Sequence, residues 1–246
     1  MIINLRQTIA FTLAETLIVM GIIGIVSALT LPNLNASTGE KEKVAKVKKI
    51  YQNLDDAVGR AQAVYGPFDE WFQNDTNAAA QSTRFAERIT EFLKVTKNCG
   101  NTTGCWSTAP LLYSDGTKYE DNYFAGLKPF NYNSFVIIAD GMALAFGCEI
   151  SEHGGCRIKV DIDGPNKGKT QLGSDIFDFF ILLDESRHDM GVINVLIPSA
   201  IPTAWTGNFS HNFVIMNYST AWVIKNDNLD YLKCTGLNWE TKTSCK

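Results

Sequence analysis

The stretch of sequence that decides the expected fold reads Ala10-Phe11-Thr12-Leu13-Ala14-Glu15-Thr16-Leu17-Ile18-Val19-Met20-Gly21-Ile22-Ile23-Gly24-Ile25-Val26-Ser27-Ala28-Leu29-Thr30-Leu31-Pro32. Between Phe11 and Leu31 the only charged residue is Glu15. A helix rises about 1.5 Å per residue, so this run extends for roughly 31 Å, close to the thickness of the hydrocarbon core of a bilayer. The sequence therefore predicts a transmembrane helix over residues 11–31.

Glu15 is the one residue that conflicts with an apolar environment. A charged side chain at the centre of a bilayer costs about 2.5–3.5 kcal/mol, so an acid in such a helix calls for a positively charged partner. Glu15 lies four residues after Phe11, about 6 Å along the helix axis. If the chain is cut before Phe11, the new α-amine of a neighbouring copy supplies that positive charge.

The sequence Phe-Thr-Leu-Ala-Glu ahead of a hydrophobic helix resembles the N-terminal signature of type IV prepilins and type II secretion pseudopilins, the class III signal peptide. The resemblance implies prepilin-type N-terminal cleavage and methylation: a peptidase cuts between Ala10 and Phe11 and methylates the amine of Phe11. It also makes Glu15 the acid that pairs with a neighbour's N-terminus during assembly. Pro32 stands where many family members have a helix-kinking proline. The family usually has glycine before the cut, where this chain has Ala10.

The same resemblance implies a function and a location. The chain would be a structural subunit, a pilin, minor pilin or pseudopilin, of a type IV pilus or a type II secretion system filament, assembled through packing of the N-terminal helix. Its partners would be other pilin or pseudopilin subunits, prepilin peptidase, an inner-membrane assembly platform and membrane lipid. It would cross the bacterial inner membrane once, with its ectodomain in the periplasm or in an extracellular filament.

Two alternatives use the same N-terminal segment differently. Val26-Ser27-Ala28 resembles a small-residue cleavage site, which would make residues 11–28 the apolar region of an ordinary secretory signal. The presence of Glu15 and an apolar run longer than about 7–15 residues favour the prepilin interpretation. The alternative from another functional class is a secreted or membrane-tethered periplasmic binding protein that does not polymerise.

Composition and motifs narrow the range of activities. The 246 residues leave room for one sizeable globular domain or two small ones after the N-terminal segment. The net charge of −4 gives no basic footprint, so direct nucleic acid binding is not expected. The chain contains no Gly-x-Ser-x-Gly, phosphate loop or His-Glu-x-x-His motif. We predict that it is not an enzyme, and we expect no cofactor.

Six cysteines fall into three sequence-local pairs, which are Cys99 with Cys105, Cys148 with Cys156, and Cys234 with Cys245. An even number of cysteines behind an export signal is typical of a disulfide framework, although six cysteines allow 15 connectivities. The competing interpretation is a zinc site, because His153 lies between Cys148 and Cys156. No Cys-x-x-Cys pair is present, and a fourth ligand would have to come from elsewhere, so disulfides are favoured.

The predicted fold class is α+β and pilin-like, with a long N-terminal transmembrane/spine helix packed on an antiparallel β-sheet ectodomain with disulfides. The expected divisions are a leader over 1–10, a transmembrane helix over 11–31, a spine helix continuation over 32–66 and a globular domain over 67–246. Apolar residues spaced by three and four from Val44 to Tyr65 predict the continuing helix, which Gly66-Pro67 ends. A second helix is predicted over Thr83–Val95.

Strand candidates follow Cys99. Two of them flank Asp140-Gly141, a strong signal for a short hairpin. The predicted strands are Ser134–Ala139, Met142–Phe146, Arg157–Ile162, Phe177–Leu183, Asn212–Met216 and Ala221–Ile224.

Two charged groups leave questions open. Asp161, Asp163, Asn166 and Asp175 offer oxygen ligands for calcium, but Pro165 and Leu172 stand where an EF-hand needs ligands. A turn in which Asp and Asn side chains bond nearby backbone amides is the favoured interpretation, and no metal ligand is assigned. The second group is a run of lysines after the apolar segment. By the positive-inside tendency alone these lysines would lie in the cytoplasm, which conflicts with export of the ectodomain. The run consists of Lys41, Lys43, Lys46, Lys48 and Lys49.

Overall fold

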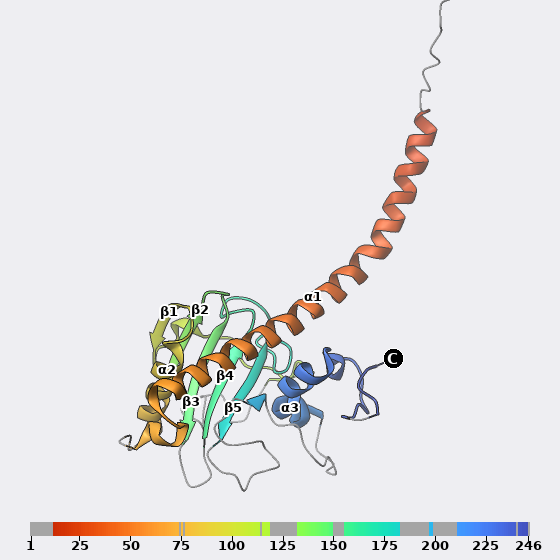
Figure 1. Cartoon of the computed structure of the whole chain (residues 1–246). Coiled ribbons are helices and arrows are strands. Elements are labelled where there is room, and N and C mark those ends of the chain that lie inside the picture. The colour runs from red at the N-terminus through yellow and green to blue at the C-terminus, as the bar shows by residue number, and fades with distance from the viewer. Residues whose placement is uncertain are drawn as a thin grey trace, which may run out of the picture. The chain divides into compact units, whose positions relative to one another are not determined.

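The computed structural model describes residues 12–73, 75, 77–113, 115–118, 132–149, 155–182, 197–198, 211–239 and 241–245. The chain divides into two units, Met1–Lys41 and Glu42–Lys246, and the boundary falls inside helix α1, Leu13–Tyr65. The second unit contains the remaining long elements (Figure 1). Its other helices are α2, Ala78–Thr90, and α3, His211–Asn226, and short 3-10 turns are η1, Phe68–Phe72, η2, Thr103–Cys105, and η3, Asp230–Leu232.

The prediction of a membrane-spanning helix is wrong for the described residues. None of the helices described there combines the length and the apolar character needed to cross a bilayer. The pilin-like fold class with a transmembrane/spine helix is therefore corrected to one long helix, α1, two shorter helices and an antiparallel sheet. The same finding contradicts the expected single-pass placement in a bacterial inner membrane.

The sheet is an antiparallel meander in which each strand pairs with the next one along the chain. Consecutive antiparallel strands need only short connections, so the order of the strands in space follows their order in sequence. The strands are β1, Val95–Gly100, β2, Ser134–Ile138, β3, Ala143–Glu149, β4, Gly155–Asp161, β5, Ile176–Leu182, and β6, Ile197–Pro198.

The hairpin predicted at Asp140-Gly141 is confirmed, because β2 and β3 pair on either side of it. Gly141 has a φ of +80°, a conformation that a residue with a Cβ rarely adopts. A second glycine, Gly164, packs against this turn so closely that a Cβ there would lie 2.3 Å from the Gly141 carbonyl oxygen. Only glycine fits at position 164, so the loop after β4 is held against the β2–β3 turn.

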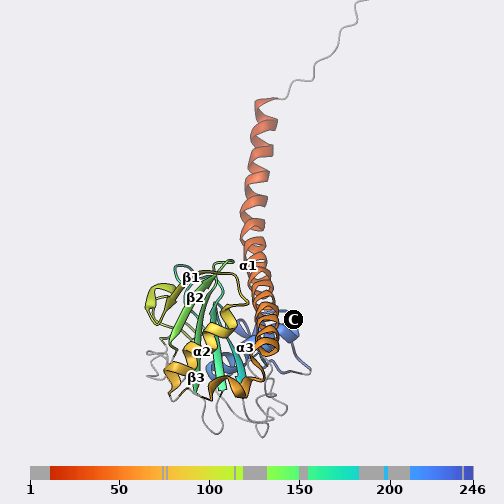
Figure 2. The same cartoon turned by 60° about the vertical axis from the view of Figure 1, so that its left-hand side comes forward.

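The second half of α1 and helix α2 cover the same face of the sheet (Figures 1 and 2). The α1 residues that face the sheet recur every three or four positions, as an amphipathic helix requires. They are Val47, Ile50, Leu54, Ala57, Val58 and Ala61, each at most 2% exposed. Tyr51 stacks on Phe179 of β5 with 6.3 Å between ring centroids, and Phe85 of α2 meets Phe146 of β3 at 5.7 Å.

Helix α2 begins five residues before the predicted Thr83, because Asn77 caps it by accepting the Ala80 N–H at 2.9 Å. It ends at Thr90, and Val95, predicted to be helical, begins β1 instead. The Ser82 hydroxyl accepts the backbone N–H of Cys148 at 2.8 Å, which docks α2 onto β3.

The predicted strands Asn212–Met216 and Ala221–Ile224 are wrong, since both segments lie in α3. Their aromatic and β-branched residues favour strands locally, but such propensities are weak beside tertiary packing. Ala221, Trp222 and Val223 are all buried, whereas a half-buried strand would expose every second side chain. Helix α3 packs beside β5 and β6.

The contact between α1 and the sheet predicts a large effect of truncating one buried side chain. Leu54 is fully buried, so we expect Leu54→Ala to lower the free energy of unfolding by about 2–5 kcal/mol through lost burial and a residual cavity. Val64 lies on the same helix but is 61% exposed, so Val64→Ala should change the free energy by less than about 0.5 kcal/mol. Urea unfolding of the two variants measures both values, and equal effects would contradict the assigned helix face.

Candidate functional site

The start of α1 is built by a reciprocal pair of side chains. The Glu15 carboxylate accepts hydrogen bonds from the backbone N–H and the hydroxyl of Thr12, both at 2.9 Å. The Glu15 N–H in turn donates to the Thr12 hydroxyl at 3.3 Å. This Thr-x-x-Glu arrangement is a capping box, in which two backbone donors left open at the first turn of a helix find acceptors.

The capping box gives Glu15 a local partner that the sequence analysis did not consider, although Thr12-x-x-Glu15 is its recognisable signal. The hydrogen bonds from the Thr12 backbone N–H and hydroxyl lower the pKa of Glu15 and keep it ionised. The assembly role of Glu15 stays a prediction. The cleavage and methylation site at Ala10 and Phe11 lies outside the described residues.

The first turns of α1 carry apolar side chains on every side of the helix. Large hydrophobic residues between Leu13 and Val26 are 52–80% exposed, and they include the consecutive run Leu17 to Met20. They are Leu13, Leu17, Ile18, Val19, Met20, Ile22, Ile23, Ile25 and Val26. A helix that is apolar all round buries its surface against other structure, and a large exposed apolar surface marks an interaction site.

Pro32 lies inside α1, and the helix continues on both sides of it. Proline has no N–H to donate to the preceding turn, so it is a common cause of helix kinks. The kink assigned to Pro32 stays a prediction.

In the second unit, lysines of α1 tie the helix to separate loops of the globular domain. Lys46 lies 2.8 Å from the Asp163 carboxylate, and Lys43 lies 2.5 Å from that of Asp175. Lys49 pairs with Asp140 at 3.0 Å, and Lys48 pairs with Asp227. In the sequence this lysine run bears only on which side of a membrane the segment would lie. The structure shows that it also serves as a set of docking contacts.

Three of the four residues considered for calcium lie together beside these lysines, and each carboxylate has protein partners. The Asp161 Oδ1 accepts the N–H groups of Asp163 and Gly164 at 3.1 and 3.0 Å, which is the turn favoured from sequence. The carboxylates of Asp163 and Asp175 are neutralised by ion pairs with Lys46 and Lys43, respectively. Asn166 is exposed, and the described part of the chain contains no set of three or more His, Cys, Asp or Glu placed to hold a metal.

Asp161 stands out in this cluster. Its side chain is fully buried, and its Oδ2 has no hydrogen-bond partner among the described residues. Burial, assisted by the carboxylates of Asp175 and Asp163 and opposed by the two backbone hydrogen bonds, raises the pKa of Asp161 to about 7. Asp161 is therefore largely protonated below neutral pH.

The face of the sheet that points away from α1 and α2 holds a buried charged pair. Lys159 of β4 and Asp178 of β5 are 1% and 3% exposed, and Nζ lies 2.8 Å from Oδ2. Arg157, Lys159 and Asp161 alternate along β4 with buried apolar residues, so the strand has a polar face and an apolar face. The strand itself was predicted from the sequence. The alternation of charged and apolar residues along it is the sequence signal that indicates its polar face.

All six cysteines form the three predicted local disulfides. Cys148 and Cys156 face each other directly across β3 and β4, so their sulfurs are bonded to each other and are not zinc ligands. The Cys99–Cys105 bond closes the turn between β1 and η2.

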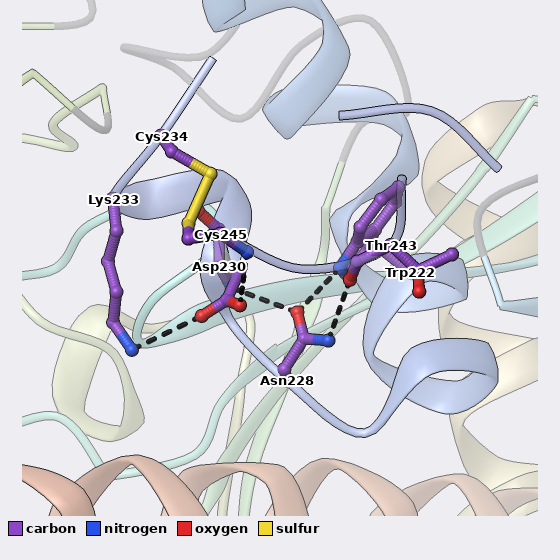
Figure 3. Close-up of a disulfide and its surroundings, with 7 residues drawn as sticks. All are labelled: Trp222, Asn228, Asp230, Lys233, Cys234, Thr243 and Cys245. Carbon is purple, nitrogen blue, oxygen red and sulfur yellow. Dashed lines mark hydrogen bonds and ion pairs between the residues drawn. A yellow bond between two sulfur atoms is a disulfide. The ribbon is translucent and has the colours of Figure 1, made fainter. Parts of the chain in front are cut away.

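The third disulfide, Cys234–Cys245, closes the C-terminal segment, which polar side chains hold against α3 (Figure 3). Asn228 accepts the Trp222 indole N–H at 2.9 Å and donates to the Thr243 carbonyl at 3.0 Å. Asp230 accepts the Cys245 N–H at 2.9 Å. These contacts position the segment without bringing a nucleophile, base or metal ligand set together.

The buried Asp161 carboxyl predicts a pH dependence of stability. The folded state keeps a proton on Asp161 up to about pH 7, whereas an unfolded aspartate releases it near its ordinary pKa of 3.8. The stabilising contribution is therefore present at low pH and is lost as the pH rises through about 7. Asp161→Asn keeps the Oδ1 acceptor and removes the titration, so the variant should gain stability relative to the parent chain between pH 4.5 and 8.

Urea unfolding at several pH values measures this difference. Asp56→Asn, which changes a largely exposed acid on α1, is the control and should follow the parent chain across the range. A constant difference between Asp161→Asn and the parent chain at all pH values would contradict the assignment.

Comparison of the chain with known protein families, with curated proteins and with solved structures finds no match in any of the three.

Proposed function

We propose that the chain is a filament subunit of the type IV pilin and type II secretion pseudopilin kind, processed before Phe11 and assembled through its N-terminal helix. The observation that carries the proposal is the apolar surface between Leu13 and Val26, whose first residues belong to a prepilin-type motif and whose acid, Glu15, caps the start of the helix. The motif supports the processing step, and the exposed surface supports the assembly step.

The driving force for assembly follows from the size of the exposed side chains. Fully burying one Val, Leu, Ile or Met side chain contributes about 1.5–3 kcal/mol, and this helix offers several on each side. A filament in which helices of many subunits pack together buries the whole circumference of each one, which a single partner does not. A helix apolar on every side suits such a bundle better than a dimer.

The competing function is a secreted or membrane-tethered periplasmic binding protein that does not polymerise. It also accounts for the three disulfides and uses the apolar segment for export, but it gives no role to the acid at the start of that segment. Among the described residues no cluster of catalytic groups favours an enzyme. The filament proposal uses more of the observed features.

The processing step predicts a defined N-terminus. The mature chain isolated from the producing cells should begin at Phe11 and carry a methyl group on its α-amine. Mass spectrometry of the N-terminal peptide identifies this species. A mature chain that starts near Leu29 would instead indicate ordinary secretion and contradict the proposal.

The assembly step predicts that Glu15 matters for its charge. Removing one partner of a buried ion pair costs about 3–5 kcal/mol, so Glu15→Gln and Glu15→Ala should be processed normally but reduce incorporation into filaments at least about tenfold. Glu15→Gln keeps an oxygen that accepts the Thr12 N–H, so it separates charge from capping. Incorporation is measured as the fraction of chain in sheared filaments.

Thr12→Ala is the matched control for the capping role. It removes the hydroxyl that caps α1 and leaves the Glu15 charge in place, at a cost of about 0.5–2 kcal/mol for a lost helix cap. Under the proposal Thr12→Ala assembles better than either Glu15 variant. If Thr12→Ala and Glu15→Ala fail equally while Glu15→Gln assembles, Glu15 serves only to cap the helix.

A further inference from the structure

The Lys159–Asp178 pair combines three features that rarely occur together. The two residues are directly opposite each other in the β4–β5 register, so the backbone fixes their separation. Their side chains are 1% and 3% exposed, and a hydrogen bond of 2.8 Å joins Nζ to Oδ2. An amine and a carboxyl group are thus held in contact in a site that water hardly reaches.

Burial favours the uncharged form of the Lys159 amine. Burial lowers the pKa of Lys159, although the Asp178 carboxylate opposes this shift. Tyr132 is buried nearby, and burial together with the Asp178 charge raises the pKa of its phenol far above the ordinary value, so the phenol remains protonated. Arg157 lies beside the Tyr132 hydroxyl, and the Asp178 Oδ1 lacks a hydrogen-bond partner among the described residues, which leaves one acceptor uncommitted in the cluster.

We propose that Lys159 and Asp178 condense spontaneously to an intramolecular amide that links β4 to β5. The bond that forms joins Lys159 Nζ to Asp178 Cγ, and the bond that breaks joins Cγ to Oδ2. Of the three protons on the ammonium group, one stays on the amide nitrogen and two leave with Oδ2 as a water molecule. The reaction needs no oxidant, reductant or further reactant.

Two physical arguments support this step. Holding two reacting groups in contact is equivalent to an effective concentration of about 10⁵–10⁸ M, which offsets the low reactivity of a carboxyl group toward an amine. A buried ion pair also carries a desolvation cost that its Coulomb attraction often fails to offset. The amide is neutral, so its formation removes that cost, and the released water leaves a site that excludes it. The remaining Asp178 oxygen then becomes an amide carbonyl, a good acceptor for the Tyr132 hydroxyl.

Intact mass spectrometry of the denatured, unreduced chain tests the proposal. The expected mass is that of the purified chain, with whatever N-terminus peptide mapping finds, less the hydrogens lost in its three disulfides and less one further water molecule. After proteolysis, one branched peptide should contain both Lys159 and Asp178, and trypsin should fail to cut after Lys159. A chain that has lost only the disulfide hydrogens would show that the pair is an ion pair and would overturn the proposal.

Two variants separate this amide from other losses of water. Lys159→Arg keeps a positive charge opposite Asp178 but lacks the amine, so it should retain the water. Asp178→Asn should release ammonia in place of water and reach the same final mass as the cross-linked parent chain.

Succinimide formation at Asp115-Gly116, Asp140-Gly141 or Asp163-Gly164 also removes a water molecule, but it is reversed by mild alkali and persists in Lys159→Arg. Water loss that maps to any of these three sites overturns the proposal. Water loss that maps to the branched peptide and disappears in Lys159→Arg supports it. Neither outcome depends on the filament function proposed above.

Discussion

The burial of one face of α1 against the sheet is the contact on which the second unit depends. Ile50, Leu54 and Ala57 have no exposed surface, and the strands supply Phe146, Ile158 and Phe179 to the same core. At about 25 cal/mol per Å² of apolar surface, this layer contributes more than any of the ion pairs around it. A meander of short strands exposes an apolar face, and α1 covers it together with α2.

The polar contacts around this core mainly fix the orientation of α1 and of the loops, and they add little to the stability. Isolated surface ion pairs contribute about 0–1 kcal/mol, so the pairs that Lys48 and Lys49 form add little stability. Each lysine nevertheless reaches a different loop, and together they fix the rotation of α1 about its axis. The close contact of Gly164 with the Gly141 carbonyl acts in the same way, because it holds two loops together through shape alone.

Local sequence patterns correctly predicted those elements in which the spacing of a few neighbouring residues is enough to indicate the structure. The spacing of Val47, Ile50 and Leu54 indicates a helix face, Asp140-Gly141 indicates a hairpin, and the cysteine spacing indicates the three disulfides. In α3 packing overrides propensity, because Trp222 and Val223 favour a strand in isolation. The prediction of a membrane-spanning helix from residues 11–31 is wrong, because no described helix combines the required length and apolarity.

Site residues that depend on long-range contacts were beyond sequence patterns. Lys43 and Asp175 are 132 positions apart, and no local rule links them. Lys159 and Asp178 become partners only once the β4–β5 register is known. The Thr12–Glu15 capping box is the exception, since its spacing of three was visible in the sequence.

The position of the Cys148–Cys156 disulfide determines how the sheet responds to proteolytic cleavage or insertions between β3 and β4. Because the two cysteines are opposite each other in the β3–β4 register, their bond closes the connection between the strands at its base. A protease that cuts residues 149–155 leaves one covalent molecule with its sheet pairing intact. Insertions in the same segment lengthen a ring that is already closed, and doubling a loop costs only about 0.6 kcal/mol. At this end of the β3–β4 pair it is therefore the disulfide, and not the length of the connection, that holds the register.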